Sequence, residues 1–500
     1  MDIKRAKLEI ENAVRAYLET DADGEYLIPS IRQRPLLLMG PPGIGKTQIM
    51  QQAARDCGVA LVSYTITHHT RQSAVGLPFI RQKNYGGHDV SVTEYTMSEI
   101  IASVYQCMQD TDLNEGILFI DEINCVSETL APTMLQFLQC KTFGNQALPQ
   151  GWVVVAAGNP PEYNRSVRDF DIVTLDRVKR MDIAPDLNVW REYARGAGIH
   201  PAILAYLELH PEHFYRITAD VDGPRFVTAR GWEDLSQFIQ ASTQVGAVID
   251  EEVVRQYLQY DEIAQDFAAY LDLYLKYQDD YGVEEILGGT VAPAVYERVQ
   301  RAAFDERLSL VSLLLAALNR RFALARFRDQ VADESFALLK RFKARLDAGA
   351  DACQELDAQI ARWQDAFEQR QKAHLADREE QKCHTACAAL LADCRAAVET
   401  DPGAGFEPAR ARFAVQAAAR QQAVEEAAEA LEAAFDFVEN AFERGQEMVV
   451  FLTELSLGPV SGPFLTENPC TRFTQYSQDL LLDGQRADIL RRLDNAEQQN

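Results

Sequence analysis

The stretch that decides the fold reads Gly40-Pro41-Pro42-Gly43-Ile44-Gly45-Lys46-Thr47. It follows the apolar run of residues 36–39 directly and precedes a helix-forming stretch from Gln48 to Arg55. The glycines let the backbone curl so that successive N–H groups point at the phosphates of a nucleotide. Lys46 adds a positive charge for the β- and γ-phosphates, and the Thr47 hydroxyl suits Mg²⁺. A strand before this motif and a helix after it distinguish a phosphate-binding loop from a chance glycine turn, so we predict that a nucleotide binds here.

Two later strands end in polar residues that suit the chemistry of a bound triphosphate. The apolar run of residues 117–120 ends in Asp121 and Glu122, and the next apolar run ends at Asn159. We expect Asp121 beside Thr47, where it holds Mg²⁺ through water, and we expect Glu122 to orient or deprotonate the attacking water. The amide of Asn159 can reach the γ-phosphate or that water. The alternative, two acidic residues that only cap a strand, is weakened by the phosphate-binding loop upstream.

Short apolar runs alternate with helix-spaced apolar residues between positions 36 and 184. Strands are expected at 36–39, 59–64, 117–121, 152–157 and 178–183. Strands separated by helices imply right-handed crossovers and a mainly parallel sheet with helices on both faces. The sequence therefore predicts an α/β nucleotide-binding domain over 1–184, a compact helical lid over 185–245 without further strands, and an all-α region over 246–500.

The C-terminal region carries two heptad-like series on either side of a helix breaker. The series run from Cys353 to Phe367 and from Val424 to Phe442, and the breaker lies at residues 400–405. This pattern predicts a coiled-coil-like antiparallel helical hairpin over about 350–447, with Phe442 opposite the neighbourhood of Phe367.

Two groups of residues resemble metal ligands, and we interpret neither as a metal site. His68 and His69 are adjacent, so their side chains point apart. Cys383, Cys387 and Cys394 share one helix face, but that spacing also suits a buried helical seam, in which free cysteine packs as a small apolar residue.

Composition narrows the possible classes of protein. The net charge of −26 argues against a protein that mainly coats nucleic acid, because neutralising phosphates needs clustered lysine and arginine. The nine cysteines lack the framework of a secreted protein, so no disulfide is expected. The apolar stretch around 308–318 is too short to cross a bilayer, and the N-terminus lacks an apolar signal region. We therefore expect a cytoplasmic protein without a membrane span.

Residues 36–240 resemble a P-loop ATPase of the AAA+ superfamily, and within it the MoxR family. The marks are the 40–47 loop, the Asp-Glu-Ile-Asn sequence at 121–124, an expected β-hairpin over 141–152 ahead of Asn159, an insertion over 68–96, and Leu-Asp-Arg at 175–177. This resemblance implies ATP and Mg²⁺ as cofactors and a ring, commonly a hexamer, with ATP between subunits.

The resemblance also implies roles for three further residues. Asn159 matches the sensor 1 position, and Arg230 matches the sensor 2 position of the helical lid. Arg177 matches the arginine finger, which one subunit inserts into its neighbour's site. Family members usually carry Phe where this chain has Val178, and Arg180 is a rival for the finger.

Three functions remain open at this stage. The first is an ATP-driven, chaperone-like remodelling protein, for which the resemblance suggests a partner with a von Willebrand factor A (VWA) domain. The second is a nucleotide-gated scaffold with little turnover, which the joint presence of Glu122, Asn159 and Arg177 disfavours. The third is a nucleic-acid motor, which the acidic balance disfavours.

Overall fold

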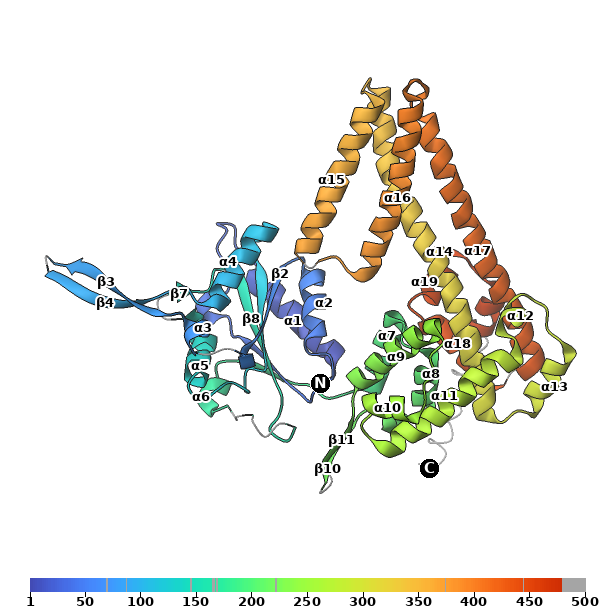
Figure 1. Ribbon diagram of the computed structural model, residues 1–500, viewed down its shortest axis with the longest axis horizontal. Helices are drawn as coiled ribbons and strands as arrows, with labels where there is room; N and C mark the ends of the chain where they lie inside the picture. The colour runs from blue at the N-terminus through green and yellow to red at the C-terminus, as the bar shows by residue number, and fades with distance from the viewer. Residues whose placement is uncertain are drawn as a thin grey trace, which may run out of the picture. The chain divides into compact units, whose positions relative to one another are not determined.

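The computed structural model describes residues 1–478 except 69–70, 87, 144–145, 164–166, 168–169, 221–222, 374 and 444. The chain divides into two units, which Figure 1 shows with their elements labelled. Unit 1 comprises residues 1–189, 228–230 and 361–381. Unit 2 comprises residues 190–227, 231–360 and the chain from 382 onward.

Unit 1 is built on a five-stranded parallel sheet, as predicted. The strand order is β2-β5-β8-β1-β9, and every described pairing is parallel. The strands are β1 (Leu36–Met39), β2 (Ala60–Thr65), β5 (Gly116–Asp121), β8 (Trp152–Gly158) and β9 (Lys179–Asp182). Each lies within one or two residues of its predicted bounds, so the α/β fold class is confirmed.

Helices cover both faces of this sheet, which explains why the central strands β1, β5 and β8 are almost continuously buried rather than alternating. On one face, Leu37, Leu118 and Val154 pack with α4 (Glu99–Thr111) and α5 (Ala131–Cys140) in one buried cluster. On the other, α2 (Gln48–Cys57) contacts β2 and β5, and α1 (Ile3–Leu18) packs on α2. The sheet is thereby fixed as a rigid platform for the loops at its edge.

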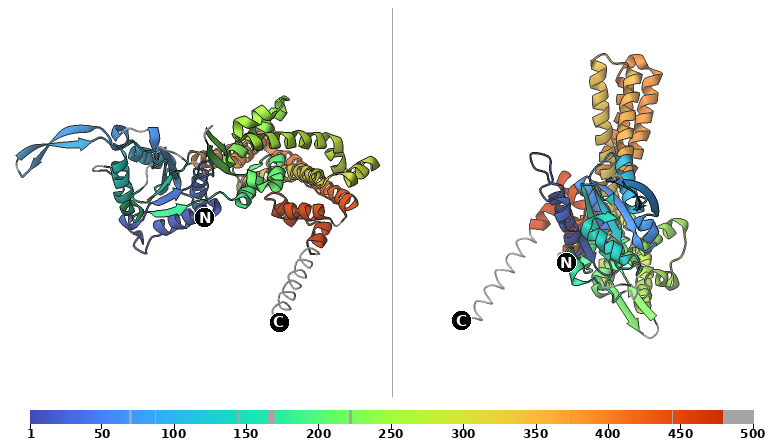
Figure 2. Two further views of the ribbon diagram at one scale, coloured as in Figure 1. Left: turned by 90° about the horizontal axis from the view of Figure 1, so that it is seen from below. Right: turned by 90° about the vertical axis from the view of Figure 1, so that its left-hand side faces the viewer.

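Two antiparallel hairpins interrupt this α/β pattern. The insertion over 68–96 contains β3 (Pro78–Tyr85) and β4 (His88–Tyr95), which project away from the rest of unit 1 in Figures 1 and 2. The hairpin expected over 141–152 contains β6 (Thr142–Phe143) and β7 (Gln146–Ala147). The remaining short elements of unit 1 are η1 (Ser30–Arg32), η2 (Ile66–His68), α3 (Arg71–Val75) and α6 (Ile172–Leu175).

The region after residue 185 is not purely helical, so the prediction that strands stop there is wrong. It begins with α7 (Leu187–Ala197), α8 (Pro201–Leu209) and η3 (Pro211–His213), and β10 (Arg216–Asp220) then pairs antiparallel with β11 (Gly223–Val227) before α9 (Ala229–Val245). The Asp-Gly dipeptide at 222–223 between β-branched and aromatic residues is a hairpin signal that our sequence analysis passed over.

Aromatic residues form the core of this region. The Trp232 ring of α9 lies 5.8 Å from Tyr206 of α8 and 5.1 Å from Phe267 of α11 (Asp261–Tyr281), measured between ring centroids. Trp232 is fully buried, and its indole N–H donates to the carbonyl of Phe214. This donor bond satisfies the polar atom of an otherwise apolar side chain.

The remaining elements of unit 2 are helical, in agreement with the predicted C-terminal region. They are α10 (Glu251–Tyr257), α12 (Val283–Leu287), α13 (Pro293–Arg301), α14 (Phe304–Asp347), α15 (Ala352–Lys372), α16 (Arg378–Thr400), η4 (Pro402–Ala404), α17 (Glu407–Phe442), α18 (Gln446–Leu457) and α19 (Ser461–Glu467). Helices α15 and α16 each continue into unit 1, which contains residues 361–381.

A helical hairpin does turn at the predicted breaker, but its long arm packs differently from the prediction. Helices α16 and α17 flank η4, and α17 packs along α14, which the prediction left out of the hairpin. Phe336 and Phe342 of α14 contact Phe413 and Phe406 at the start of α17. A break after α15 at Lys372 interrupts the first predicted arm, so α15 and α16 are separate helices.

Helix α14 contains an 18-residue window that is apolar enough to span a membrane by length and composition. However, 56% of that window is buried inside the protein, as in the core helix of a soluble domain. Cys383, Cys387 and Cys394 of α16 are all buried, which agrees with the predicted seam.

We predict that Gly116→Ala destabilises unit 1. Gly116 pairs with Trp152 across β5 and β8, and an added Cβ would lie 2.6 Å from the buried indole ring. We expect a loss of about 1–3 kcal/mol in the free energy of unfolding, measured by denaturant titration. Gly196→Ala in α7 is the control, because its nearest neighbour lies 3.9 Å away. Equal stability of the two variants would contradict the packing described here.

Candidate nucleotide-binding site

The candidate site lies where three parallel strands end at one edge of the sheet. Strand β8 pairs with both β1 and β5, so the carboxyl ends of all three strands are neighbours. The 40–47 loop follows β1, Asp121 and Glu122 come at the end of β5, and Asn159 follows β8. The edge beyond the carboxyl ends of strands is where open α/β sheets bind ligands. Helix α2 begins directly after the loop and directs its positive N-terminus to the same place.

Lys46 lies at the centre of the loop and is only 9% exposed. Its ammonium group donates to the carbonyl oxygens of Gly40 and Pro41, each at 2.8 Å, and to Oδ1 of Asn159 at 2.9 Å. Burial lowers the pKa of Lys46 to about 8, the charge of Asp121 opposes this shift, and the charge of Arg230 adds to it. An anion bound in the loop would therefore stabilise the charged form of Lys46.

Thr47 and Asp121 provide an oxygen pair beside this cation. The Thr47 hydroxyl donates to Oδ2 of Asp121 at 2.8 Å, and the backbone N–H of Glu122 donates to Oδ1 at 2.9 Å. Both carboxylate oxygens of Asp121 are thus held in place. Glu122 has a positive φ of 57°, a conformation that costs energy for a non-glycine residue and is concentrated at functional sites.

Asn124 is a residue to which our sequence analysis gave no role. It is 3% exposed, and its Nδ2 donates to the carbonyl of Asn159 at 2.8 Å, which joins the end of β5 to the end of β8. Its Oδ1 has no hydrogen-bond partner within the described part of the chain. Gly158 permits this contact, because a Cβ there would lie 2.4 Å from Oδ1. The available sequence signal was the Asp-Glu-Ile-Asn run at 121–124, which ends in this asparagine.

The start of α9 contacts the loop through its backbone. The N–H of Arg230 donates to the carbonyl of Gly43 at 3.1 Å. Gly43 has a φ of 71°, and an added Cβ would lie 2.8 Å from Oγ1 of Thr228. Residues 228–230 accordingly belong to unit 1, and the exposed Arg230 side chain lies close enough to influence Lys46.

Arg177 and Arg180 are exposed. Neither takes part in the hydrogen bonds that join Lys46 to Asn159 and Thr47 to Asp121. The Arg177 guanidinium donates to the side-chain carbonyl of Gln139, a neutral partner. Arg180 of β9 is paired with Asp182 of the same strand at 2.8 Å. The predicted histidine pair at 68–69 lies outside the residues whose side chains the structure describes.

Comparison with known families agrees with this geometry. Residues 36–174 match the model of the ATPase family associated with various cellular activities (AAA). Residues 36–174 form an AAA domain. A search of the curated proteins finds no match to this sequence. The AAA match starts at β1 and ends inside α6, so it includes Lys46, Asp121, Glu122 and Asn159 but neither Arg177 nor Arg230. The AAA domain implies ATP binding and ATP-driven activity.

The donor atoms of the AAA domain fit the two groups that the sequence predicts. Mg²⁺ prefers hard oxygen ligands, and the Thr47 hydroxyl with the Asp121 carboxylate supplies them. The curled loop, its ammonium group and the start of α2 supply donors for phosphate oxygens.

We predict that ATP affinity falls as the pH rises above about 8. Phosphate oxygens favour the charged form of Lys46, whose pKa of about 8 in the free protein means that binding above this pH must take up a proton. The dissociation constant should be flat from pH 6.5 to 7.5 and then rise by at most about tenfold per pH unit.

Fluorescence titration with an ATP analogue at constant ionic strength measures this effect. Lys46→Arg is the matched variant, because a guanidinium stays charged throughout the range. A wild-type profile as flat as that of Lys46→Arg would contradict the assignment.

Proposed function

We propose that the protein is a Mg²⁺-dependent ATP-hydrolysing remodelling protein of MoxR type that acts as a ring, most simply a hexamer. The proposal rests on two hydrogen bonds within the AAA domain. Lys46 of the loop bonds to Asn159, and Thr47 of the loop bonds to Asp121 of the acidic strand. The MoxR-type sequence marks and the inserted hairpins support the finer assignment.

In this proposal each residue of the site performs one physical task. Lys46 and the loop N–H groups bind the β- and γ-phosphates, while Thr47 and Asp121 hold the magnesium ion that neutralises charge on the phosphates. Glu122 orients the lytic water and accepts its proton, and the left-handed backbone at this residue fixes the direction of its side chain. Asn159 contacts Lys46 and is placed to sense the γ-phosphate.

We predict that Glu122→Gln binds ATP with unchanged affinity but hydrolyses it about 10²–10⁴-fold more slowly, because only the proton acceptor is removed. Phosphate release and ATP binding are measured on the same preparation. Lys46→Ala is the control that should lose binding. Wild-type turnover no faster than that of Glu122→Gln would favour the scaffold function instead.

We propose Arg177, rather than Arg180, as the arginine finger that acts on the neighbouring subunit. Arg180 is neutralised by Asp182, which its guanidinium contacts through two nitrogen atoms. Arg177 is exposed in the turn after α6, and its guanidinium donates to a neutral amide. The Asp171 carboxylate interacts with this charge through space, so the guanidinium can turn to developing charge on another subunit's γ-phosphate. Such a cation is worth about 10³–10⁵ in rate in other phosphoryl-transfer systems.

We predict that mixtures of inactive variants regain activity if Arg177 acts between subunits. Arg177→Ala and Glu122→Gln should each be inactive alone, yet random mixing in equal amounts leaves about a quarter of the interfaces with both groups intact. Phosphate release from the mixture is the measurement. Arg180→Ala alone should retain activity. An inactive mixture together with an inactive Arg180→Ala would move the finger to Arg180.

Arg230 is proposed to couple the nucleotide state to the lid. Its backbone already bonds to Gly43, and its charge lies near Lys46, so binding of phosphate to the loop changes the field that Arg230 experiences. A client protein and a VWA-domain partner complete the proposal on the strength of the MoxR resemblance. A neighbouring gene with the Asp-x-Ser-x-Ser motif of such a domain would support that partner.

A further inference from the structure

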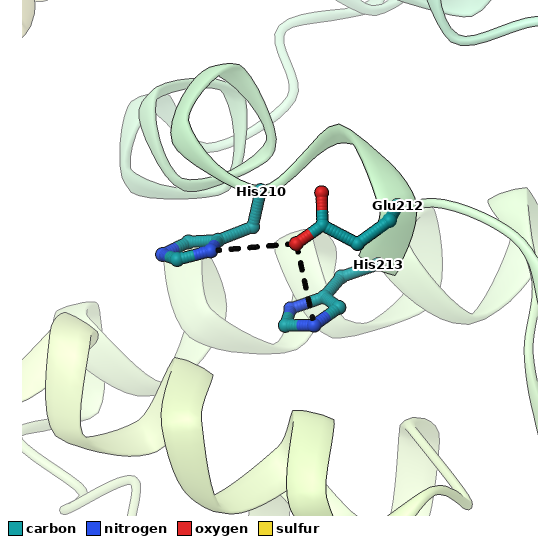
Figure 3. Close-up of side chains that lie close together, drawn as sticks. All are labelled: His210, Glu212 and His213. Carbon is teal, nitrogen blue, oxygen red and sulfur yellow. Dashed lines mark ion pairs between the residues drawn. The ribbon is translucent and has the colours of Figure 1, made fainter.

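We propose that His210, Glu212 and His213 form a binding site for a first-row divalent transition metal, zinc in the first place. The three residues lie at the end of α8 and in η3 of unit 2, separate from the nucleotide-binding residues in the chain. Figure 3 shows both imidazole rings beside the same carboxylate. The proposal does not depend on the proposed ATPase function.

The donor atoms are already gathered around one point. His210 Nδ1 and His213 Nε2 each lie 3.8 Å from Oε1 of Glu212. One ligand atom from each of the three residues lies within 4.8 Å of the other two. Zinc bonds of about 2.0–2.2 Å place tetrahedral ligands about 3.4 Å apart, so the donor atoms must move inward to bind one ion. The two rings are stacked with an angle of 11° between them. Because the lone pair of each nitrogen lies in its ring plane, one ring must also turn about its side-chain bonds before both nitrogens point at the ion.

A hydrogen-bond chain behind His213 leaves the correct nitrogen free for a metal. The Tyr206 hydroxyl donates to Oδ2 of Asp266 at 2.8 Å, because an ionised carboxylate only accepts. The same hydroxyl oxygen lies 2.7 Å from His213 Nδ1 and must therefore accept its proton. The lone pair of neutral His213 is then on Nε2, the nitrogen beside Glu212. Metal-binding histidines are commonly oriented by such a second hydrogen bond.

The chemistry of the donors selects the class of metal. Two imidazole nitrogens and one carboxylate suit zinc and its first-row neighbours, whereas Mg²⁺ and Ca²⁺ prefer oxygen ligands throughout. Glu212 is 65% exposed, so the fourth position faces solvent and can hold water or a ligand from outside. A bound ion would fix the end of α8 to η3 and, through Tyr206 and Asp266, to α11.

A second cluster, Glu334 with Cys383 and Cys387, is explained without a metal. Both thiols donate to Oε2 of Glu334, at 3.5 and 3.7 Å. These hydrogen bonds give the polar atoms of this buried cluster partners within the protein as they stand.

The test is a metal titration of the full-length protein after treatment with a chelator. Co²⁺ should produce visible d–d bands without the near-ultraviolet thiolate-to-cobalt band, and Zn²⁺ should displace it at one ion per chain. Glu212→Gln and His210→Ala should weaken this binding at least tenfold, and Tyr206→Phe should weaken it by about tenfold through loss of orientation. His88→Ala, at an exposed histidine of β4, should bind like the wild type.

Two results would overturn the proposal. One is equal zinc affinity in the wild type, Glu212→Gln and His210→Ala, with all three shown to be folded by circular dichroism. The other is a cobalt spectrum that carries the thiolate band and disappears in Cys387→Ser, which would assign the ion to the cysteine cluster. Glu212→Gln keeps the size of an exposed side chain, so misfolding cannot account for a loss of binding in that variant.

Discussion

The hydrogen bonds of the Lys46 ammonium group are the constraint on which the nucleotide site depends. They join two carbonyl groups of the loop after β1 to Asn159 after β8, and they do so where water is largely excluded. A buried cation is costly unless its protons are bound and opposite charge lies near. The parallel pairing of β1, β8 and β5 supplies both conditions, because it sets Asn159 and Asp121 at the same edge as the loop. The geometry of the site therefore depends first on how the three strands pair, and only then on the individual residues.

The same edge is connected to segments far along the chain. The backbone N–H of Arg230 donates a hydrogen bond to the carbonyl of Gly43, so a change in the loop conformation acts directly on the start of α9. Helix α2, which begins at the loop, carries Arg55, and Arg55 forms an ion pair of 2.9 Å with Asp377. Residues 361–381 belong to unit 1, but the chain on both sides of them continues into helices of unit 2. Covalent continuity thus gives two routes by which the state of the loop can reach the helical region.

The parallel sheet was predictable from the sequence, and the packing of the C-terminal helices was not. The five strands are short and separated by helical segments, and β1, β5 and β8 are almost continuously apolar and buried, so their bounds and parallel arrangement follow from local pattern. The heptad spacing around Phe435 identified a buried helix face but not its neighbours, because periodicity carries no information about partners. That ring packs against Phe451 of α18. The β10–β11 hairpin and Asn124 were missed for a different reason, since their signals are single residues and a dipeptide rather than repeats.

The nucleotide site and the proposed histidine site, both among the described residues, illustrate how ligand type can keep different ions apart. Thr47 and Asp121 offer only oxygen, beside a loop that attracts phosphates, and this combination suits an ion that keeps part of its water and shares ligands with a nucleotide. His210, Glu212 and His213 offer two nitrogens in an orientation fixed by Tyr206, which suits an ion that binds imidazole. Magnesium competes weakly for the second group, because it prefers oxygen ligands throughout. One polypeptide can therefore hold a cation that arrives with its nucleotide and another whose occupancy is governed by transition-metal supply.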